Sequence, residues 1–108
     1  MKYVISITCR NLANGYLEWT AQLLTYGQAT NLPQDTLRQF SRQLNCCPGV
    51  VTYALSHDAL VVTMDLKPGD PAQRRRLFDD ALNLVILGIT ADGRMPFEVH
   101  FSQGRPAF

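Results

Sequence analysis

Apolar and polar residues alternate along four segments of the chain, which is the spacing of strands with one buried face. In the first segment Ile5 and Ile7 fall on one parity, whereas Ser6 and Thr8 fall on the other. A serine-histidine-aspartate run at 56–58 separates the two middle segments and has the composition of a hairpin turn. The alternation predicts strands over 2–9, 50–55, 59–66 and 97–102.

Three other segments carry apolar residues at helical spacing. The first places Leu17, Ala21 and Leu24 on one face, and the second places Phe40 and Leu44 opposite arginines and glutamines. These patterns predict helices over 15–26 with Asn14 as N-cap, over 33–45 opening on Pro33, and over 71–89 with Asp70 as N-cap and Pro71 in the first turn.

The predicted order of elements is β-α-α-β-β-α-β. A βαβ unit, a hairpin and a second crossover favour a ferredoxin-like (split βαβ) fold of the α+β class, with a four-stranded antiparallel sheet and helices on one face. We expect the opposite face to be polar, with Ser6, Thr63 and His100 among its residues, open to water or to a partner. A chain of 108 residues is expected to form a single domain over 1–108. Residues 103–108 contain Gly and Pro and are predicted to be a loose tail, with Phe108 either docked or free.

Charge narrows the range of partners. Ten Lys+Arg against nine Asp+Glu give a formal net charge of +1, which is far from the basic balance of most nucleic-acid binders. The apolar stretches are too short for a bilayer span, and the N-terminal run lacks the pattern of a signal peptide. Three cysteines, two of them adjacent, do not make a disulfide framework. We therefore expect a cytoplasmic protein with no membrane partner.

The adjacent thiols Cys46 and Cys47 are the most unusual local feature. Such a pair can bind a metal, form a vicinal disulfide or act in redox chemistry. A zinc site usually needs four ligands, and the cysteines and histidines here lack the spacing of known zinc motifs. We favour cysteine as a small, partly buried apolar residue and expect no metal and no cofactor.

Catalytic chemistry has two weak candidates. Ser56, His57 and Asp58 supply the residue types of a triad, but neighbours in a turn point apart, so turn hydrogen bonding is favoured. His100 falls on the outward parity of its strand, where Lys2, Thr63 or Asp65 could join it in a small catalytic patch. No phosphate loop or metalloprotease motif is present, and we expect a protein that is not an enzyme.

A run of three arginines opens the longest predicted helix. Arg74, Arg75 and Arg76 could hold phosphate or an acidic partner. Asp79 and Asp80 lie four residues after two of them, at the spacing of neutralising ion pairs. Binding of phosphate or nucleic acid is therefore an alternative and not the favoured function.

The C-terminal half of this helix is more apolar than one buried stripe requires. Leu84, Ile86 and Leu87 are additional to that stripe, and exposed apolar patches of this kind mark partner surfaces. The alternative is that another helix or the tail covers them. Tyr16 and Trp19 are aromatic residues of the type that interfaces favour, on a predicted helix that carries little charge.

We expect a small non-enzymatic protein-binding module that acts as an inhibitor, an immunity-type factor or an adaptor of a larger macromolecular complex. Its partner is expected to be another protein or a second copy of itself in a homodimer. The alternatives are a nucleic-acid or phosphate binder and a small metal or redox protein that uses Cys46 and Cys47. The expected protein contacts are Tyr16, Trp19, Arg75, Arg76, Ile86 and Leu87, and the alternative nucleic-acid contacts are Arg38, Arg42, Arg74, Arg75 and Arg76.

Overall fold

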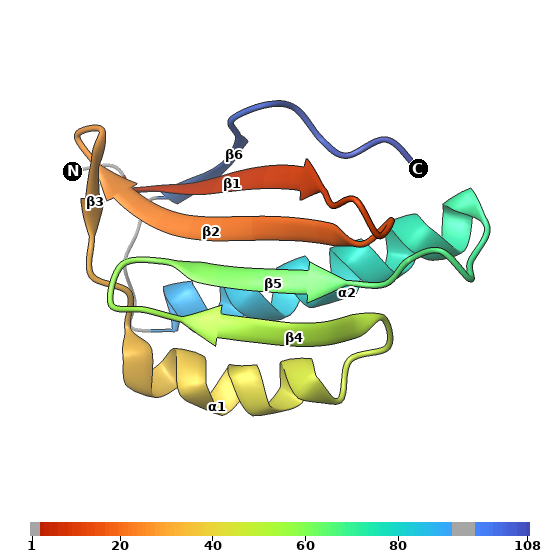
Figure 1. Ribbon diagram of the computed structural model, residues 1–108. Helices are drawn as coiled ribbons and strands as arrows, with labels where there is room; N and C mark the ends of the chain where they lie inside the picture. Colours follow the sequence, from red (N-terminus) through yellow and green to blue (C-terminus); the bar gives the residue numbers. More distant parts are fainter. Residues whose placement is uncertain (1–2, 92–96) are drawn as a thin grey trace.

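The computed structural model describes residues 3–91 and 97–108 and shows an α+β fold (Figure 1). In these residues a mixed sheet of six strands packs against two helices. The elements in chain order are β1 (Tyr3–Asn11), β2 (Leu17–Thr25), β3 (Gln28–Thr30), α1 (Gln34–Asn45), β4 (Val50–Leu55), β5 (Leu60–Met64), α2 (Pro71–Thr90) and β6 (Phe97–Phe101).

The sheet has the strand order β4-β5-β2-β1-β6, and the short β3 pairs with β2 beside this path. β1 and β2 form a long antiparallel hairpin, with Tyr3 opposite Thr25 at one end and Asn11 opposite Leu17 at the other. β6 returns parallel to β1 and makes one edge of the sheet, while β4 makes the other. Segments distant in sequence therefore lie side by side at the centre of the fold.

The predicted helix over 15–26 is wrong, because this segment forms β2 and the turn that follows. Asn14 is not an N-cap, since its side chain accepts from the Tyr16 N–H at 3.0 Å within the β1–β2 turn. Gly27 is not a helix stop but part of a second turn, in which Tyr26 and Gly27 both have positive φ. The apolar residues of this segment fit both the helical and the strand period. The segment forms a strand because β1 and β5 supply hydrogen-bonding partners on either side of it.

The ferredoxin-like, four-stranded order is not confirmed, because the β1–β2 hairpin stands where the first crossover helix was expected. The other expected helices and the hairpin of β4 and β5 are present. The N-terminus of α2 has a capping box, in which Asp70 accepts from the Gln73 N–H at 2.8 Å and its own N–H donates to the Gln73 amide oxygen at 3.1 Å. The helices that the sequence marks with local signals, such as this capping box, were therefore predicted correctly where no distant strand pairs with the segment.

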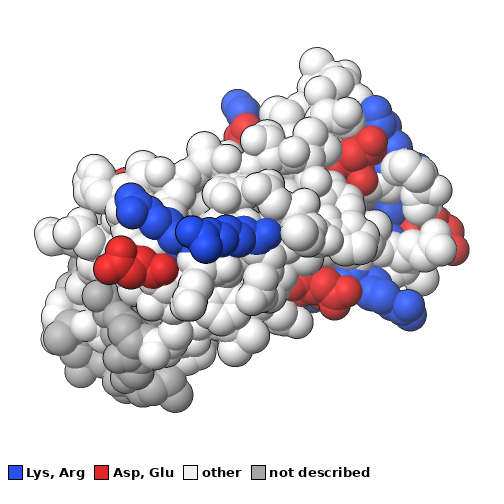
Figure 2. Space-filling model, turned by 90° about the horizontal axis from the view of Figure 1, so that it is seen from below, with Lys and Arg blue, Asp and Glu red and all other residues white. Residues whose placement is uncertain are grey.

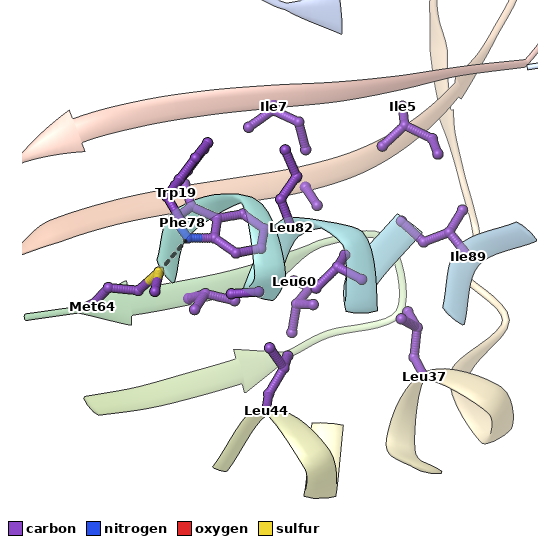
Figure 3. Close-up of a cluster of buried hydrophobic side chains, with 14 of the residues drawn as sticks. Ile5, Ile7, Trp19, Leu37, Leu44, Leu60, Met64, Phe78, Leu82 and Ile89 are labelled. Atoms are coloured by element: carbon purple, nitrogen blue, oxygen red, sulfur yellow. Dashed lines mark hydrogen bonds between the residues drawn. The ribbon is translucent and has the colours of Figure 1, made fainter. Parts of the chain in front are cut away.

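The core lies between one face of the sheet and the two helices, and Trp19 is its largest fully buried side chain (Figure 3). Trp19 has no exposed surface, and its indole N–H donates to the Met64 sulfur at 3.3 Å. The Phe78 ring packs edge to face on it, with centroids 5.9 Å apart. Alternate residues of β2 complete this face, which is why a single parity of that strand is buried.

The opposite face of the sheet is polar, and no described helix or strand covers it. In register across β1 and β2, Ser6 lies opposite Gln22 and Thr8 lies opposite Thr20. On β5, Thr63 continues the row of Glu18. This arrangement agrees with the expectation of a polar outward face, although its strand order differs from the one predicted.

The C-terminal tail is ordered by contacts with the core edge. The Phe108 ring lies 5.7 Å from the Phe78 ring, and the Arg105 guanidinium lies 4.9 Å above the Phe101 ring. Figure 1 shows the tail leaving the end of β6 and running alongside β1 to the C-terminus. Of the two expectations for Phe108, the docked one is therefore correct.

No helix in the described part of the chain is both long enough and apolar enough to cross a membrane.

Candidate protein-binding site

A groove opens between the C-terminal half of α2 and the edge strand β6. We call it the α2–β6 groove. Val99 is 37% exposed on its β6 wall, and Leu87, the residue after the groove-lining Ile86, is 56% exposed on the solvent side of α2. Helical spacing produces this geometry, because α2 buries Phe78, Val85 and Ile89 against the sheet and turns the intervening residues toward β6 or solvent. The groove is lined by Asp79, Leu82, Asn83, Ile86, Val99, Phe101 and Arg105.

The wall formed by β6 also offers backbone hydrogen-bonding groups. The Ser102 N–H donates to the Ile7 carbonyl at 3.0 Å, which fixes the phase of the parallel ladder between β6 and β1. Since peptide groups alternate in direction along a strand, those of Phe97, Val99 and Phe101 point away from β1. No strand within 3–91 or 97–108 pairs with that outer edge.

Charged groups stand at the end of the groove nearest the tail. Arg105 and Asp79 line the groove itself, and Arg75 joins both in a neighbouring pocket that Phe108 closes. The expected ion pairs of Arg75 with Asp79 and of Arg76 with Asp80 are not formed. The ion pairs recorded between described residues are Arg10 with Glu18 at 2.8 Å and His57 with Asp58 at 3.9 Å. Arg75 and Arg76 therefore keep exposed, un-neutralised charges.

The structure separates the six expected contact residues. Ile86 lines the groove, Leu87 is exposed on α2 without lining it, and Arg75 lines the neighbouring pocket with Asp79 and Arg105. Arg76 instead lines a hollow with Pro68, Gly69, Gln73 and Leu77.

Tyr16 lies in the β1–β2 turn, where the Lys67 ammonium sits 4.6 Å from its ring centroid, and it does not line the groove. Trp19 is a core residue and cannot reach a partner in this fold. Val99 and Phe101 were missed, because alternation marked them only as the buried parity of a strand. Recognising them requires knowledge that this strand is the sheet edge.

The cysteines are free thiols, with Cys46 exposed and Cys9 and Cys47 half-buried. Burial raises the pKa of the Cys9 thiol. Burial, followed by the charges of Asp80 and Cys46, raises the pKa of Cys47. A raised pKa keeps a thiol protonated and slow as a nucleophile. Among the residues placed by the structure, no three His, Cys, Asp or Glu gather in a way that could hold a metal ion.

The histidines lie in two separate surroundings. The Ser56 hydroxyl donates to Asp58 at 3.3 Å and to the Ala59 carbonyl at 3.1 Å, which is the turn bonding expected for this run. His100 lies opposite Ser6 on the polar face. Thr63 and Asp65 cannot join it, since β2 and β1 stand between β5 and β6. Lys2, the other expected neighbour, lies outside the described residues.

The arginines of the nucleic-acid alternative do not form one cluster. Arg38 and Arg42 line a hollow between α1 and β4, together with Ser41 and Tyr53. Arg74 lies in α2, and its guanidinium donates at 3.1 Å to the carbonyl of Lys67 in the loop that precedes this helix. Figure 2 views the molecule from below, where a short band of basic groups lies beside acidic atoms on the left and further basic and acidic groups are mixed on the right, with uncharged surface between them.

In comparisons with known proteins, the chain matches no family model, no curated protein and no solved structure.

Proposed function

We propose that this protein is a non-enzymatic protein-binding module, serving as an inhibitor, an immunity-type factor or an adaptor, and that the α2–β6 groove is its contact surface. The observation that carries the proposal is the combination of exposed Leu87 and Val99 with the outward peptide groups of β6. Apolar side chains beside an unpaired strand edge are the features that extended protein segments recognise.

The free energies involved favour a contact that uses both the apolar side chains and the outward peptide groups of β6. Covering the exposed parts of Leu87 and Val99 contributes about 1 kcal/mol each. Association costs about 4–15 kcal/mol in lost translational and rotational freedom. The apolar contact is therefore too small alone, and hydrogen bonds along β6 together with Ile86 must supply the rest.

The test compares Leu87→Asp with a matched control, Val51→Asp. Val51 is 50% exposed on β4, at the opposite edge of the sheet, so both changes place one carboxylate at a similarly exposed apolar position. The tagged chain and both variants are recovered from a lysate of the cells that make it, and co-purifying proteins are quantified by mass spectrometry. We expect a partner, the chain itself included, that is retained by Val51→Asp and lost by Leu87→Asp. Equal recovery with both variants would contradict the proposal.

A second candidate function, phosphate binding, is favoured by one observation. The Ser41 hydroxyl is buried without a hydrogen-bond partner and lines the hollow that Arg38 and Arg42 border. Two arginines four residues apart on a helix repel each other, and a bound anion would relieve that repulsion. Titration with inorganic phosphate, followed by amide chemical shifts of α1, tests this candidate. Saturable shifts that Arg38→Gln abolishes would support it, and unchanged spectra would remove it.

A further inference from the structure

We propose that the occupant of the β6 edge is a second copy of this chain, with the two β6 strands paired antiparallel about a two-fold axis at Val99. The inference rests on the proposed function and deepens it by naming the partner. It joins the two sheets into one continuous sheet across the interface and brings the two α2–β6 grooves together.

The sequence of β6 complements itself when it is reversed. The strand reads Phe97-Glu98-Val99-His100-Phe101. Antiparallel pairing centred on Val99 places Phe97 opposite Phe101 of the other copy, Val99 opposite itself, and Glu98 opposite His100. Aromatic and β-branched residues thus meet their own kind, and the acidic side chain meets a basic one instead of another carboxylate. Cross-strand pairs of these kinds stabilise a sheet, and like charges in the same places would destabilise it.

The direction of the peptide groups fits the same register. Phe97, Val99 and Phe101 point their N–H and C=O groups outward, so the Val99 pair makes two hydrogen bonds of an antiparallel ladder, and each Phe101 N–H donates one more to the Phe97 carbonyl of the other copy. The Phe101 carbonyl already accepts from Gly104 at 3.2 Å, but its N–H remains directed at the edge. Glu98 and His100 then occupy the non-hydrogen-bonded positions, where opposite side chains approach most closely.

The two edges of the sheet differ in a way that favours β6. The register of β4 on β5 shifts between Val50 and Thr52, which is a bulge of the kind that blocks edge-to-edge pairing. β6 keeps unbroken register with β1 from Phe97 to Phe101. β6 is therefore the edge better suited to another strand, and the half-buried Ile86 of α2 lies beside it in the groove.

The pairing of the two β6 strands also determines where the two copies of α2 lie. α2 lies on the inner face of the sheet and forms the groove with β6, so a two-fold axis through Val99 places the grooves of the two copies on the same face of the joined sheet, on either side of the axis. Ile86, which the single chain leaves partly uncovered, lines the side of α2 that faces β6 and therefore the other copy. One contact between two copies therefore accounts for both the partly uncovered Ile86 of α2 and the self-complementary sequence of β6.

The experiment measures solution mass by sedimentation equilibrium from micromolar to millimolar chain. Val99→Pro removes an N–H that points outward, so the β1 ladder keeps all its bonds while the interface loses two by symmetry. We expect a dimer whose Kd rises about a hundredfold in Val99→Pro, since each lost bond is worth about tenfold. His100→Glu places carboxylates opposite each other and is expected to raise Kd about tenfold. The double exchange Glu98→His with His100→Glu again sets a carboxylate opposite an imidazole instead of another carboxylate, and should recover dimerisation.

The control is Thr52→Glu, which adds a carboxylate to the same face at the β4 edge and should leave the dimer intact. A wild-type chain that stays monomeric, or a dimer that Val99→Pro and His100→Glu both leave unchanged, would overturn the inference. If Val99→Pro fails to fold by Trp19 fluorescence, the exchange pair at 98 and 100 decides alone. If the chain is monomeric but Leu87→Asp still loses the partner recovered from the lysate, the dimer is excluded and the proposed function remains supported.

Discussion

At the scale of single residues, Trp19 shows how burial and hydrogen bonding are linked in this core. The indole is fully enclosed, and the sulfur of Met64 accepts its N–H at 3.3 Å. A thioether is a weak acceptor, yet it spares a buried donor the cost of having none. Met64 therefore has a role in the core that an aliphatic residue of the same volume cannot fill.

Met64→Leu tests this role. We expect the free energy of unfolding to fall by about 1–3 kcal/mol, because the Trp19 N–H loses its acceptor in a site closed to water. The control is Leu60→Met, a size-conserving exchange at another fully buried residue of β5 that changes no hydrogen bond. Urea unfolding followed by tryptophan fluorescence measures both variants. Equal losses in the two would show that packing, not the indole bond, sets the cost.

The half-buried thiols predict a stability change at alkaline pH. Burial raises the pKa of Cys9 above its ordinary value of 9.0 in the folded chain. The unfolded chain then loses the thiol proton first, so the stabilisation from this group is complete below pH 9.0 and is lost as the pH rises through the folded pKa. We expect Cys9→Ala to flatten the fall in unfolding free energy above pH 9.0. Urea unfolding under reducing conditions at several pH values measures this, and parallel curves for both proteins would contradict it.

At the scale of elements, local signals predicted what local contacts determine. The capping box of Asp70 and Gln73 marks the start of α2 within a few residues of sequence. β2 was misread because Leu17 and Ala21 satisfy helical spacing, while Trp19 and Leu23 complete an alternation with them. The choice between these periods is made by β1 and β5, which lie on either side of β2 in space. No property of residues 17–25 alone contains that information.

The contact between the two helices gives a prediction of its own. A Cβ at Gly88 would stand 2.9 Å from the Leu37 side chain, so the glycine sets how closely α1 approaches α2. Gly88→Ala adds helix propensity but overpacks this contact, and Leu37→Val opens the same space. We expect the double variant to be more stable than the sum of the single changes by about 0.5–1 kcal/mol. Additive losses in urea unfolding would show that Leu37 moves aside at no cost.

At the scale of the whole molecule, the candidate site is a consequence of strand order. The apolar surplus of α2 was visible in the sequence and identified Ile86 and Leu87. Val99 is a candidate contact because β6 is an edge strand of the sheet. Trp19 is not a candidate, because β2 is a central strand and buries it. The exposure of Leu87, which one helix determines, was therefore predicted correctly, whereas the burial of Trp19 depends on the arrangement of distant strands and was missed.

The central claim is that a protein chain pairs with the β6 edge, and amide hydrogen exchange at Val99 tests it most directly. In the isolated chain the Val99 N–H points outward and should exchange quickly, whereas the His100 N–H faces β1 and serves as an internal reference. The account predicts that Val99 exchange slows about tenfold or more between dilute and concentrated protein, while His100 stays protected throughout. Fast exchange at Val99 at every concentration, and also in the presence of any captured partner, would contradict it.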